Sequence, residues 1–455
     1  MARKYFLESY GCQMSFHDAE RLAGLLEHEG YEPAAEADAD LVIVNTCSVR
    51  ERAEEKLYTR LGEIRQAASE AGRRPIVAVT GCVAQQEGTA LQKGLAAVDV
   101  VVGTQSLKHL PALVKVHEDT RRRTIDIHPH EDVSFPLGLV KHGDPVRAWV
   151  TIIEGCNEFC SFCVVPYTRG HERMRPVRDI LAEVQQAADS GRKEVQLLGQ
   201  IVNHYQAPDD PTCRFPELLE RVSLVPGIVR VRFASPHPRH VSPRLLEVMR
   251  DVPAVCKHLH MPVQSGSNRI LDRMRRRYTR ETYLDLVAQA RETVPGVTVS
   301  TDMIVGFPGE SPADFDDTLA LVSSARFHSM YSFKYSPRPN TLASKRMPDD
   351  VTEAEKTRRI IELQQLQKSI QLDLFGQAVG TIEPVLIDGV SRRRDTEVTG
   401  RTSGNTVVNF QGEADWLGQV VDVRISAAAP NSLRGEAVTS RPGTGPSSEE
   451  LQTCS

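Results

Sequence analysis

The most informative segment of the sequence is Gly155-Cys156-Asn157-Glu158-Phe159-Cys160-Ser161-Phe162-Cys163, which we call the cysteine loop. Its cysteines follow the pattern C-x3-C-x2-C and come directly after the β-rich run Arg147–Ile153. Three thiolates this close can ligate three irons of a 4Fe-4S cluster and leave the fourth iron open to a small molecule. A zinc site is the alternative for the same spacing. We expect a catalytic iron–sulfur site on Cys156, Cys160 and Cys163, which we call the loop triad.

The cysteine loop lies near the start of a series of short β-rich runs separated by helical patterns, which spans residues 145–372. The six runs are Arg147–Ile153, Glu194–Leu198, Arg230–Phe233, His258–Met261, Thr298–Val305 and Tyr331–Lys334. Alternating strands and helices predict parallel βα units, and six units are too few to close an eight-stranded barrel. We predict an open, partial (βα)6 barrel with its chemistry at the C-terminal ends of the strands, followed by an amphipathic helix over Thr352–Gln371.

Residues 1–118 show the same alternation and predict a doubly wound α/β domain with a mostly parallel sheet. Three cysteines spaced thirty-five residues apart, Cys12, Cys47 and Cys82, each follow a predicted strand, and we call them the strand-end triad. The carboxyl ends of strands in an open α/β sheet lie at the edge where ligands bind, so we expect a shared metal site. The alternative is three unrelated buried thiols, because cysteine also packs as a small hydrophobic residue.

The remaining segments differ in composition and pattern from these two domains. The polar stretch 119–144 predicts a linker. Residues 375–438, with β-branched runs punctuated by glycine, predict a small C-terminal β-barrel, and the stretch 439–455 predicts a disordered tail. Three cysteines carry no motif, and we expect them to be packed or surface thiols: Cys213, Cys256 and Cys454.

The composition bounds the class of protein. Of 455 residues, 40% are hydrophobic and 25% are charged, with a formal net charge of −5. These values exclude a wholly disordered chain and a polybasic coat for nucleic acid, although not a local basic face. Apolar runs are of strand length, far below the about 20 residues that cross a bilayer. Nine cysteines without a signal-peptide pattern favour reduced thiols, so we expect a cytoplasmic protein that does not enter a membrane.

Further motifs give the sequence a specific resemblance. They are Tyr10-Gly11-Cys12-Gln13-Met14, Asn45-Thr46-Cys47, Thr80-Gly81-Cys82, Val164-Val165-Pro166-Tyr167-Thr168-Arg169-Gly170, Leu197-Leu198-Gly199-Gln200, Met261-Pro262-Val263-Gln264-Ser265-Gly266-Ser267 and Thr301-Asp302-Met303-Ile304-Val305-Gly306-Phe307-Pro308-Gly309-Glu310. Together with the cysteine loop they resemble the radical S-adenosylmethionine (SAM) methylthiotransferases, from residue 3 to about residue 438. The resemblance is greatest to the MiaB-type branch, which acts on N6-isopentenyl-adenosine next to the tRNA anticodon.

That resemblance implies two 4Fe-4S clusters, each with one open iron. On the loop triad, the open iron binds SAM and the reduced cluster cleaves it to a 5′-deoxyadenosyl radical, which needs a low potential and an enclosed site. On the strand-end triad, the second cluster carries the inserted sulfur. One SAM supplies the methyl group, and another supplies the radical that activates adenosine C2. A flavodoxin- or ferredoxin-type reductant and a sulfur donor are also implied, and we expect a monomer.

Residues at the strand ends of the predicted barrel are candidates to hold SAM beside Phe162 of the cysteine loop. They follow the second to fifth strands: Gly199, Gln200, Ser235, Gln264 and Gly306. A glycine lets a ligand approach the backbone closely, and the carboxyl rim is where barrel sites form. The alternative for each position is ordinary turn geometry.

The C-terminal module resembles the TRAM domain of RNA-modifying enzymes, with Gly400–Asn405 as its recognisable turn, and this implies tRNA as a partner. Residues 375–438 nevertheless carry six Lys/Arg against eight Asp/Glu. Candidate RNA contacts are Arg392, Arg393, Arg394 and Arg401. A second basic cluster, Arg273–Arg277, lies in the barrel domain, and the alternative for both clusters is a solvated surface.

We therefore expect a tRNA methylthiotransferase that converts N6-isopentenyladenosine at position 37 to its 2-methylthio form. Two sibling activities remain as alternatives, one on threonylcarbamoyladenosine in tRNA and one on an aspartate of a ribosomal protein. Val165–Gly170 and the Gly400–Asn405 turn favour the first substrate. An alternative from another class is an iron–sulfur RNA-binding regulator, which would bind a cluster without cleaving SAM.

Overall fold

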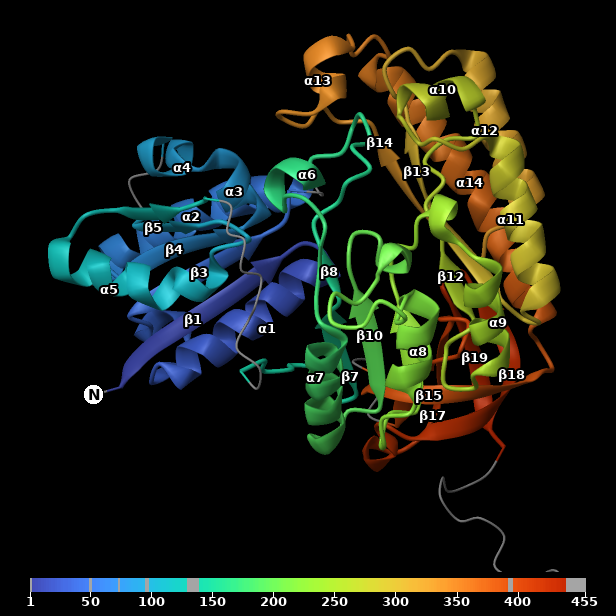
Figure 1. The fold of residues 1–455 in the computed structure, drawn as a ribbon, viewed down its shortest axis with the longest axis horizontal. Helices are drawn as coiled ribbons and strands as arrows, with labels where there is room; N and C mark the ends of the chain where they lie inside the picture. The colour runs from blue at the N-terminus through green and yellow to red at the C-terminus, as the bar shows by residue number, and fades with distance from the viewer. Residues whose placement is uncertain are drawn as a thin grey trace, which may run out of the picture.

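The computed structural model describes residues 2–48, 51–72, 74–94, 98–128, 139–391 and 396–438, arranged as three domains. Figure 1 shows the first domain in blue beside the barrel domain in green to orange, with the third domain in red at the base of the barrel. Two predictions lie outside the described residues, namely the disordered tail 439–455, which includes Cys454, and the RNA contacts Arg392, Arg393 and Arg394.

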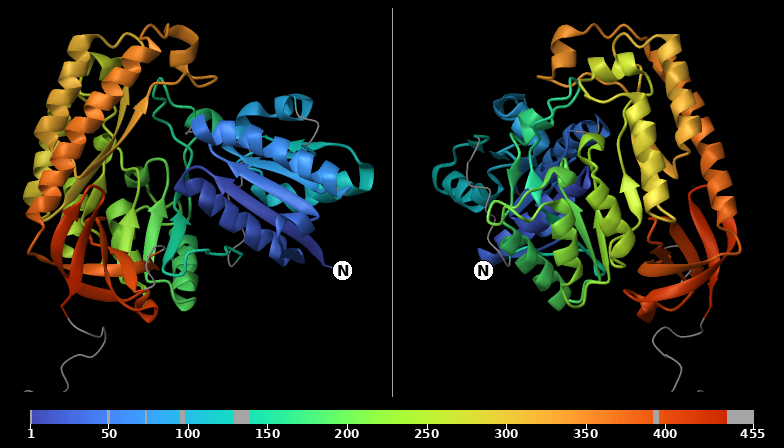
Figure 2. Two further views of the ribbon diagram at one scale, coloured as in Figure 1. Left: turned by 180° about the vertical axis from the view of Figure 1, so that it is seen from behind. Right: turned by 45° about the vertical axis from the view of Figure 1, so that its right-hand side comes forward.

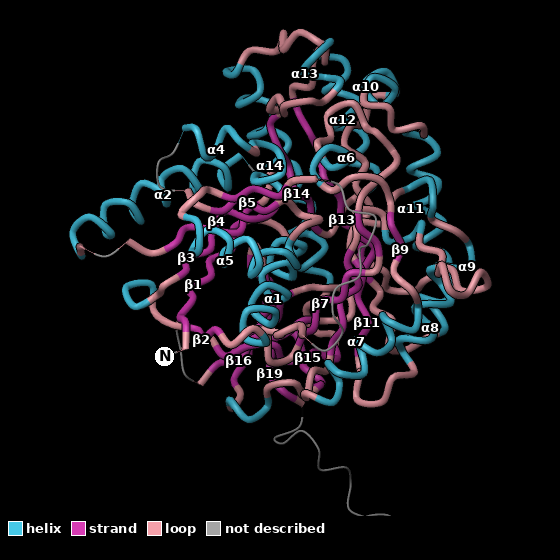
Figure 3. Tube along the Cα trace, turned by 60° about the vertical axis from the view of Figure 1, so that its left-hand side comes forward, coloured by secondary structure: helices cyan, strands magenta, loops and turns pink. Residues whose placement is uncertain are grey.

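The first domain is built on one six-stranded parallel sheet with the order β2-β1-β3-β4-β5-β6. Its strands are β1 (Arg3–Tyr10), β2 (Tyr31–Pro33), β3 (Leu41–Thr46), β4 (Ile76–Gly81), β5 (Val100–Val102) and β6 (Thr124–Asp126). Its helices are α1 (Gln13–His28), η1 (Glu36–Asp38), α2 (Glu51–Ala71), α3 (Cys82–Glu87), α4 (Thr89–Gly94), η2 (Leu107–His109) and α5 (Leu110–Thr120). Helices cover both faces (Figure 3), which is why β3 is buried along its whole length. The predicted doubly wound α/β fold is confirmed.

The sheet continues beyond the boundary predicted at residue 118. Helix α5 runs to Thr120, and β6 pairs in parallel with β5, so the first domain extends into the stretch predicted as a linker. The described part of the connection is packed against α1, since Lys141 Nζ lies 2.5 Å from Glu27 Oε2 and Gly143 N donates to Glu20 at 2.8 Å. A strand of three residues is too short to show in a pattern of alternation, and β6 was missed for that reason.

The second domain is an open barrel of six parallel strands in two sheets, β7-β10-β11 and β12-β13-β14. A parallel bridge between Val231 and Val255 joins the two sheets, whereas β7 and β14 are the outer edges. The strands agree with the six predicted runs to within two residues: β7 (Arg147–Thr151), β10 (Glu194–Leu198), β11 (Arg230–Phe233), β12 (His258–His260), β13 (Thr298–Val305) and β14 (Ser329–Lys334). The partial (βα)6 barrel is confirmed.

Helices surround this barrel, and one hydrophobic core lies between them and the strands. The helices are α6 (Val165–Thr168), α7 (Val177–Asp189), η3 (Val202–His204), α8 (Phe215–Ser223), η4 (Pro238–His240), α9 (Pro243–Asp251), α10 (Asn268–Arg273), α11 (Arg280–Thr293), α12 (Pro312–Ala325) and α13 (Leu342–Arg346). A short antiparallel pair, β8 (Ile153–Glu154) and β9 (Arg173–Met174), brackets the cysteine loop and α6.

Helix α14 (Glu353–Gln377) is the predicted amphipathic helix, extended at its C-terminal end. It runs along the outside of the barrel (Figure 2) and delivers Phe375 into the core of the third domain. That domain is the predicted small barrel, closed in the order β15-β16-β17-β19-β18. Its elements are β15 (Ile382–Val390), β16 (Glu397–Arg401), β17 (Val407–Gln411), η5 (Ala414–Trp416), β18 (Val420–Ala429) and β19 (Ser432–Ala437).

The third domain covers the base of the second, where the barrel strands begin. Its turn between β16 and β17 is bonded to this base. The hydrogen bonds include Arg232 to Thr402 O at 2.7 Å, Lys257 N to Ser403 Oγ at 2.9 Å, and Thr298 Oγ1 to Gly404 O at 2.7 Å. The turn is therefore a contact between domains, and the opposite, C-terminal rim remains for chemistry. Within the described ranges, we find no helix with the length and hydropathy needed to cross a membrane.

Candidate functional site

The cysteine loop follows β8 at the C-terminal rim and is clamped by segments distant in sequence. Ser161 donates from N to Met274 O at 3.0 Å and from Oγ to Arg273 O at 2.7 Å, and Ala343 N donates to Ser161 O at 2.8 Å. Phe162 packs edge-on against Phe307 with ring centroids 6.5 Å apart. These contacts fix the backbone between the second and third cysteines, so the loop triad projects from a held frame.

The loop triad is largely buried, and its charge depends on that burial and on a neighbouring arginine. Burial raises the pKa of Cys156 and of Cys163 to about 12. The buried Arg276 donates from Nη1 to Cys160 Sγ at 3.3 Å. The basic cluster Arg273–Arg277, expected either to bind RNA or to be solvated, is thus corrected for this member, whose side chain packs beneath the cysteine loop.

The strand-end triad is assembled by the sheet of the first domain. Cys12 is the N-cap of α1, Cys47 directly follows β3, and Cys82 is the first residue of α3. The sulfurs of Cys12 and Cys47 are 3.6 Å apart. Gly11 makes this approach possible, because its φ is +135° and a Cβ there would lie 2.2 Å from Cys47 Cβ. The expectation that these cysteines converge at one sheet edge is therefore confirmed for this pair by distance.

Charge distinguishes the strand-end triad from the loop triad. The hydrogen bond from Cys47 lowers the pKa of Cys12 and of Cys82, and the nearby guanidinium of Arg169 lowers both further. The same hydrogen bonds raise the pKa of Cys47. Thiolate is the form that binds iron, so two of these three sulfurs are already biased toward the ligating state.

Neither triad brings all three of its sulfurs to the spacing of thiolates around a single ion. Thiolates around one zinc, at about 2.3 Å from it, lie only about 4 Å from one another. Among the described residues, the single group of three ligand atoms lying within 4.8 Å of one another is Glu158, His237 and His240, so each triad is spread more widely. Beside Cys47, the buried hydroxyls of Thr46 and Ser48 have no hydrogen-bond partner among the described residues, so they are available to donate to a sulfide.

The group Glu158, His237 and His240 is a poor site for a divalent cation. Arg239 Nη1 binds both carboxylate oxygens of Glu158, at 3.2 and 3.0 Å, and the Arg277 guanidinium lies 3.8 Å from the same carboxylate. Two guanidinium groups already neutralise the one carboxylate, and they would repel a second cation. We interpret this group as an ion-pair cluster on the rim.

Arg169 joins the two triads, and sequence reasoning noted it only as part of a motif. It lies six residues after the loop triad and is buried in an ion pair with Asp18 of α1, at 2.5 Å. The same segment binds the first domain through its backbone, since Thr104 Oγ1 donates to Thr168 O at 2.5 Å and Gln105 Nε2 donates to Arg169 O at 3.0 Å. A single sequence gives no signal that an arginine within such a motif is buried against another domain.

A second buried ionic group ties α1 to the start of the barrel. His17 Nδ1 lies 2.7 Å from Thr151 Oγ1, and its other ring nitrogen lies 3.4 Å from Glu183, which also pairs with Arg175 at 2.7 Å. Burial opposes ionisation of Glu183, but Arg175 and His17 outweigh it and hold the pKa of this carboxyl well below its usual range. The two domains therefore meet through buried, paired charges.

The predicted SAM-binding positions lie together along the C-terminal rim. A Cβ at Gly199 would stand 2.2 Å from Ile153 Cγ2, so only glycine fits there. Gln200 Oε1 is buried without a hydrogen-bond partner. Ser235 and Gln264 adopt left-handed φ values of 60° and 78°, which turn the chain sharply after β11 and β12. Strained turns and an unsatisfied amide on one rim fit a polar ligand such as SAM.

His237 is a rim residue that sequence analysis did not select. It is 5% exposed, and its Nε2 has no hydrogen-bond partner. Burial, followed by the positive charge of Arg276, lowers the pKa of His237 to about 2, so the ring is neutral. The segment Ser235-Pro236-His237-Pro238 directly after a predicted strand was the available signal.

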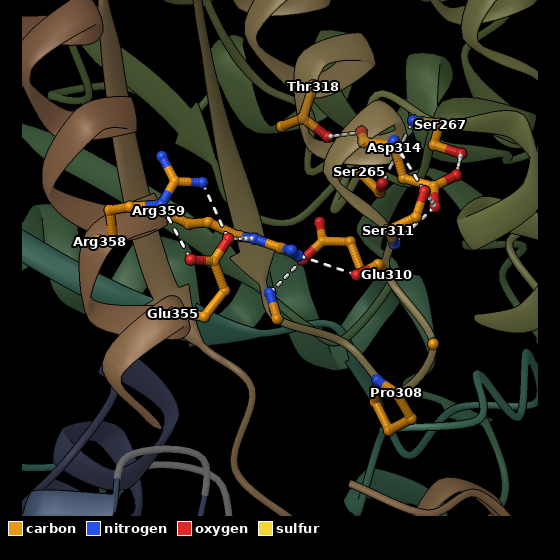
Figure 4. Close-up of polar contacts among 12 residues, drawn as sticks. Ser265, Ser267, Pro308, Glu310, Ser311, Asp314, Thr318, Glu355, Arg358 and Arg359 are labelled. Carbon is orange, nitrogen blue, oxygen red and sulfur yellow. Dashed lines mark hydrogen bonds and ion pairs between the residues drawn. The ribbon is translucent and has the colours of Figure 1, made fainter. Parts of the chain in front are cut away.

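Gly306 opens a loop that is held from behind by a chain of polar contacts (Figure 4). Its N–H donates to Glu310, whose carboxylate lies 2.8 Å from Arg359 of α14. Arg359 is also paired with Glu355 at 2.8 Å. Further along the loop, Ser267, Ser311 and Arg269 converge on the carboxylate of Asp314. The loops after β12 and β13 are thus fixed to each other and to α14.

The structure describes one predicted RNA contact, Arg401, and places it at the junction of two domains. Its Nε donates to Asp388 at 3.2 Å, and Asp388 also pairs with Arg147 of β7 at 3.1 Å. The backbone oxygen of Arg401 accepts a hydrogen bond from Arg230. One third of its side chain stays exposed, and a phosphate contact remains a prediction.

Family comparison divides the chain in the same way as its fold. Residues 4–103 match the "Uncharacterized protein family UPF0004", residues 150–322 match the Radical SAM superfamily, and residues 376–438 match the TRAM domain.

Curated relatives extend this likeness over nearly the whole chain. Proteins named tRNA-2-methylthio-N(6)-dimethylallyladenosine synthase from Geobacter metallireducens, Acidovorax sp. and Carboxydothermus hydrogenoformans are each 42% identical to it. The alignments cover 95% of this chain and 97% of the first protein, 96% and 98% for the second, and 96% and 100% for the third.

Solved structures share the fold at much lower identity. The radical SAM methyltransferase TsrM from Kitasatospora setae, with cobalamin and a [4Fe-4S] cluster bound, has a TM-score of 0.57 at 15% identity and covers 86% of this chain and 82% of its own. The cobalamin-dependent SAM radical enzyme OxsB has a TM-score of 0.51 at 11% identity, covering 81% and 56%.

Proposed function

This chain belongs to the family of tRNA-2-methylthio-N(6)-dimethylallyladenosine synthases, which are radical SAM methylthiotransferases, and we propose that its two cysteine triads divide that reaction between them. The reaction replaces the hydrogen on C2 of N6-isopentenyladenosine (the dimethylallyl compound) at position 37 of tRNA by a methylthio group. Its cofactors are SAM and two 4Fe-4S clusters. In this proposal, the loop triad serves radical formation and the strand-end triad serves sulfur transfer.

Cys156, Cys160 and Cys163 would hold the radical-forming cluster, which when bound supplies the electron that cleaves SAM. Arg276 offsets negative charge at Cys160 from below. Gln200 and His237, whose buried polar atoms lack partners, would bind polar groups of SAM along the rim.

The rest of the rim would position SAM and exclude water from it. Phe162 and Phe307 close the apolar side of the cysteine loop, so a radical formed there would meet few competing hydrogens. Gly199, Ser235, Gln264 and Gly306 would shape the backbone around the ligand.

Cys12, Cys47 and Cys82 would hold the second cluster, from which sulfur is transferred. The buried hydroxyls of Thr46 and Ser48 beside Cys47 would donate hydrogen bonds to the sulfides of that cluster. The Arg169 guanidinium would balance the negative charge of thiolates and sulfide.

One observation carries the division of labour: a single segment, Cys156–Gly170, begins with the loop triad and ends against the strand-end triad. Cys156 N donates to Gly170 O at 3.1 Å, so the segment closes on itself at the first cysteine. Arg169 of the same segment is buried against Asp18 of α1. A short, doubly anchored connection is what a reaction needs if a radical made at one site must act where sulfur is held at the other.

tRNA is the partner that the relatives and the TRAM match support. Phosphate contacts would come from Arg392, Arg393, Arg394 and the exposed part of Arg401. We further propose a flavodoxin- or ferredoxin-type reductant, a separate sulfur donor, a monomeric state and a cytoplasmic location, where thiols stay reduced.

The deciding experiment is deletion of the gene followed by mass spectrometry of tRNA nucleosides. We expect 2-methylthio-N6-isopentenyladenosine to disappear and its unmethylthiolated precursor to accumulate. Complementation with the natural sequence should restore the product, and Cys12→Ala or Cys156→Ala should not. Cys213→Ala, which removes a buried thiol outside both triads, is the matched control and should complement.

Two outcomes would overturn this assignment. Unchanged 2-methylthio-N6-isopentenyladenosine with loss of a methylthiolated threonylcarbamoyladenosine or ribosomal aspartate would assign the sibling activities instead. Purified, reduced protein that forms no 5′-deoxyadenosine from SAM would favour the non-catalytic regulator.

A further inference from the structure

We infer that Tyr331 and Phe333 of β14 form the surface on which the target adenine and its apolar N6 group stack, with His260 and Asp302 facing the polar edge of the base. We call these four residues the base platform. The inference rests on the proposed function, because it names where the substrate of that reaction binds.

The two aromatic side chains face the interior of the open barrel. Ser332 accepts a hydrogen bond from Gln364 of α14 at 2.9 Å, and Lys334 forms an ion pair with the first residue of α14. Successive side chains of a strand point to opposite faces. Because Ser332 and Lys334 face the outer helix, Tyr331 and Phe333 face inward.

These rings are unusually open for aromatic residues inside a barrel. Tyr331 is 57% exposed and Phe333 is 40% exposed, whereas Tyr335, two residues after Phe333, is 5% exposed. Tyr335 is covered because it packs edge-on against Phe307, whereas Tyr331 and Phe333 lie on β14, the edge strand of its sheet. Adjacent exposed aromatic rings beside a catalytic rim are typical of a ligand surface rather than of a core.

Polar groups complete the platform on the neighbouring strands. The parallel register places Asp302 beside Tyr331, and His260 Nε2 lies 3.4 Å from Asp302 Oδ1. The His260 ring stands edge-on to Tyr331, with centroids 6.0 Å apart. The surface therefore combines flat aromatic area with one donor and acceptor pair.

This combination matches the chemistry of an adenine with a hydrocarbon on N6. Unpaired bases in RNA loops are recognised by stacking on aromatic side chains and by hydrogen bonds to their edges. Enzymes that act on a ring atom turn the base out of its stack into the site. A five-carbon N6 group adds apolar area, which Phe333 would cover.

The base platform also leads toward the loop triad. Tyr335, two residues after Phe333, stacks edge-on against Phe307 at 5.2 Å. Phe307 in turn contacts Phe162 of the cysteine loop. A base lying on the platform would therefore have its reactive ring beneath the rim where SAM is proposed to bind.

The test uses the reconstituted full-length enzyme and a synthetic anticodon stem-loop that carries N6-dimethylallyladenosine. Tyr331→Ala and Phe333→Ala should each raise the KM for this RNA by about 5- to 100-fold, the usual effect of removing one stacked base contact. Formation of 5′-deoxyadenosine from SAM without RNA should stay at the level of the unaltered enzyme. Tyr331→Phe, which keeps the ring, should retain a KM within about twofold. Tyr58→Ala, which removes a tyrosine that is 44% exposed on α2, is the matched control.

A second RNA, with plain adenosine at the target position, reports on the N6 group. The unaltered enzyme should bind it more weakly than the dimethylallyl stem-loop, and Phe333→Ala should reduce that preference. Unchanged KM values in both alanine variants would overturn the inference. Loss of RNA-independent SAM cleavage would also overturn it, since the residues would then serve SAM. Failure of the unaltered enzyme to modify either RNA would refute the proposed function itself.

Discussion

The two triads contain the same ligands and are built in opposite ways. The loop triad comes from eight consecutive residues on one loop, where burial raises the pKa of Cys156 and of Cys163. The strand-end triad is collected from three βα junctions, where the hydrogen bond from Cys47 and then the charge of Arg169 from the other domain lower the pKa of Cys12 and of Cys82. Two sites with the same three cysteine ligands thus depend on different parts of the fold. The loop triad depends on one loop held by contacts within its own domain, whereas the strand-end triad also depends on an arginine of the other domain.

Replacing whole triads should give the largest effect and separate their roles. Alanine at Cys156, Cys160 and Cys163 should abolish 5′-deoxyadenosine formation and lower bound iron from about eight atoms to about four. Alanine at the strand-end triad should remove the same amount of iron yet leave SAM cleavage in place. Iron assay and chromatography of SAM products measure both. Retention of full iron, or loss of SAM cleavage in both variants, would contradict the division.

Arg169→Gln tests whether the strand-end triad depends on the barrel domain. It leaves the carboxylate of Asp18 buried and unpaired, which should cost about 3–5 kcal/mol of unfolding free energy. Iron should be lost from the strand-end triad first. The double variant Arg169→Gln/Asp18→Asn should recover most of the stability. Arg178→Gln, at a side chain 77% exposed, is the control, and denaturant unfolding measures all three. An effect equal to that of the control would show that Arg169 is dispensable.

Gly199→Ala tests the packing of the rim beside the loop triad. The new Cβ would stand 2.2 Å from Ile153 Cγ2, and such overpacking should cost about 1–3 kcal/mol and raise the KM for SAM. Gly62→Ala on α2 is the matched control, since its Cβ would meet nothing within 4 Å. That control should stabilise the protein by about 0.5–1 kcal/mol. Equal melting temperatures for the two variants would refute the steric argument.

Glu183→Gln should change stability by an amount that depends on pH. In the folded protein the pKa of Glu183 lies well below its usual value of 4.5, so its ionic contribution is fully present above that pH. The contribution is lost as the pH falls through the folded-state pKa. The difference in unfolding free energy between the unaltered protein and Glu183→Gln should therefore be larger at pH 7 than at pH 4. A difference that grows on acidification would have the wrong sign.

Features that depend on neighbouring residues could be predicted from the sequence, whereas contacts between distant segments could not. The C-x3-C-x2-C spacing and the alternation of strands predicted the loop triad and the six barrel strands, because both are set by neighbouring residues. The positions of Arg169, Arg276 and His237 were not predicted, since each is defined by contacts with segments far away in the chain.

The third domain shows the same limit in a different form. The resemblance predicted a small barrel at 375–438, and the family match to the TRAM domain agrees with it. The turn after β16 was interpreted as a feature of an RNA-binding module, yet its polar groups bond to the base of the second domain. A turn motif predicts the local conformation of the backbone but not which residues the turn contacts.

The closed base of the barrel limits the routes by which ligands enter and leave the interior. With the turn after β16 bonded to the starts of β11, β12 and β13, molecules reach the interior from the opposite rim or past the free edge of β14. In the proposed reaction, SAM, its spent fragments and the RNA base would then pass over the rim or past that edge. An RNA loop bound across these openings would narrow the route by which the spent fragments leave, so we expect bound RNA to slow the exchange of SAM.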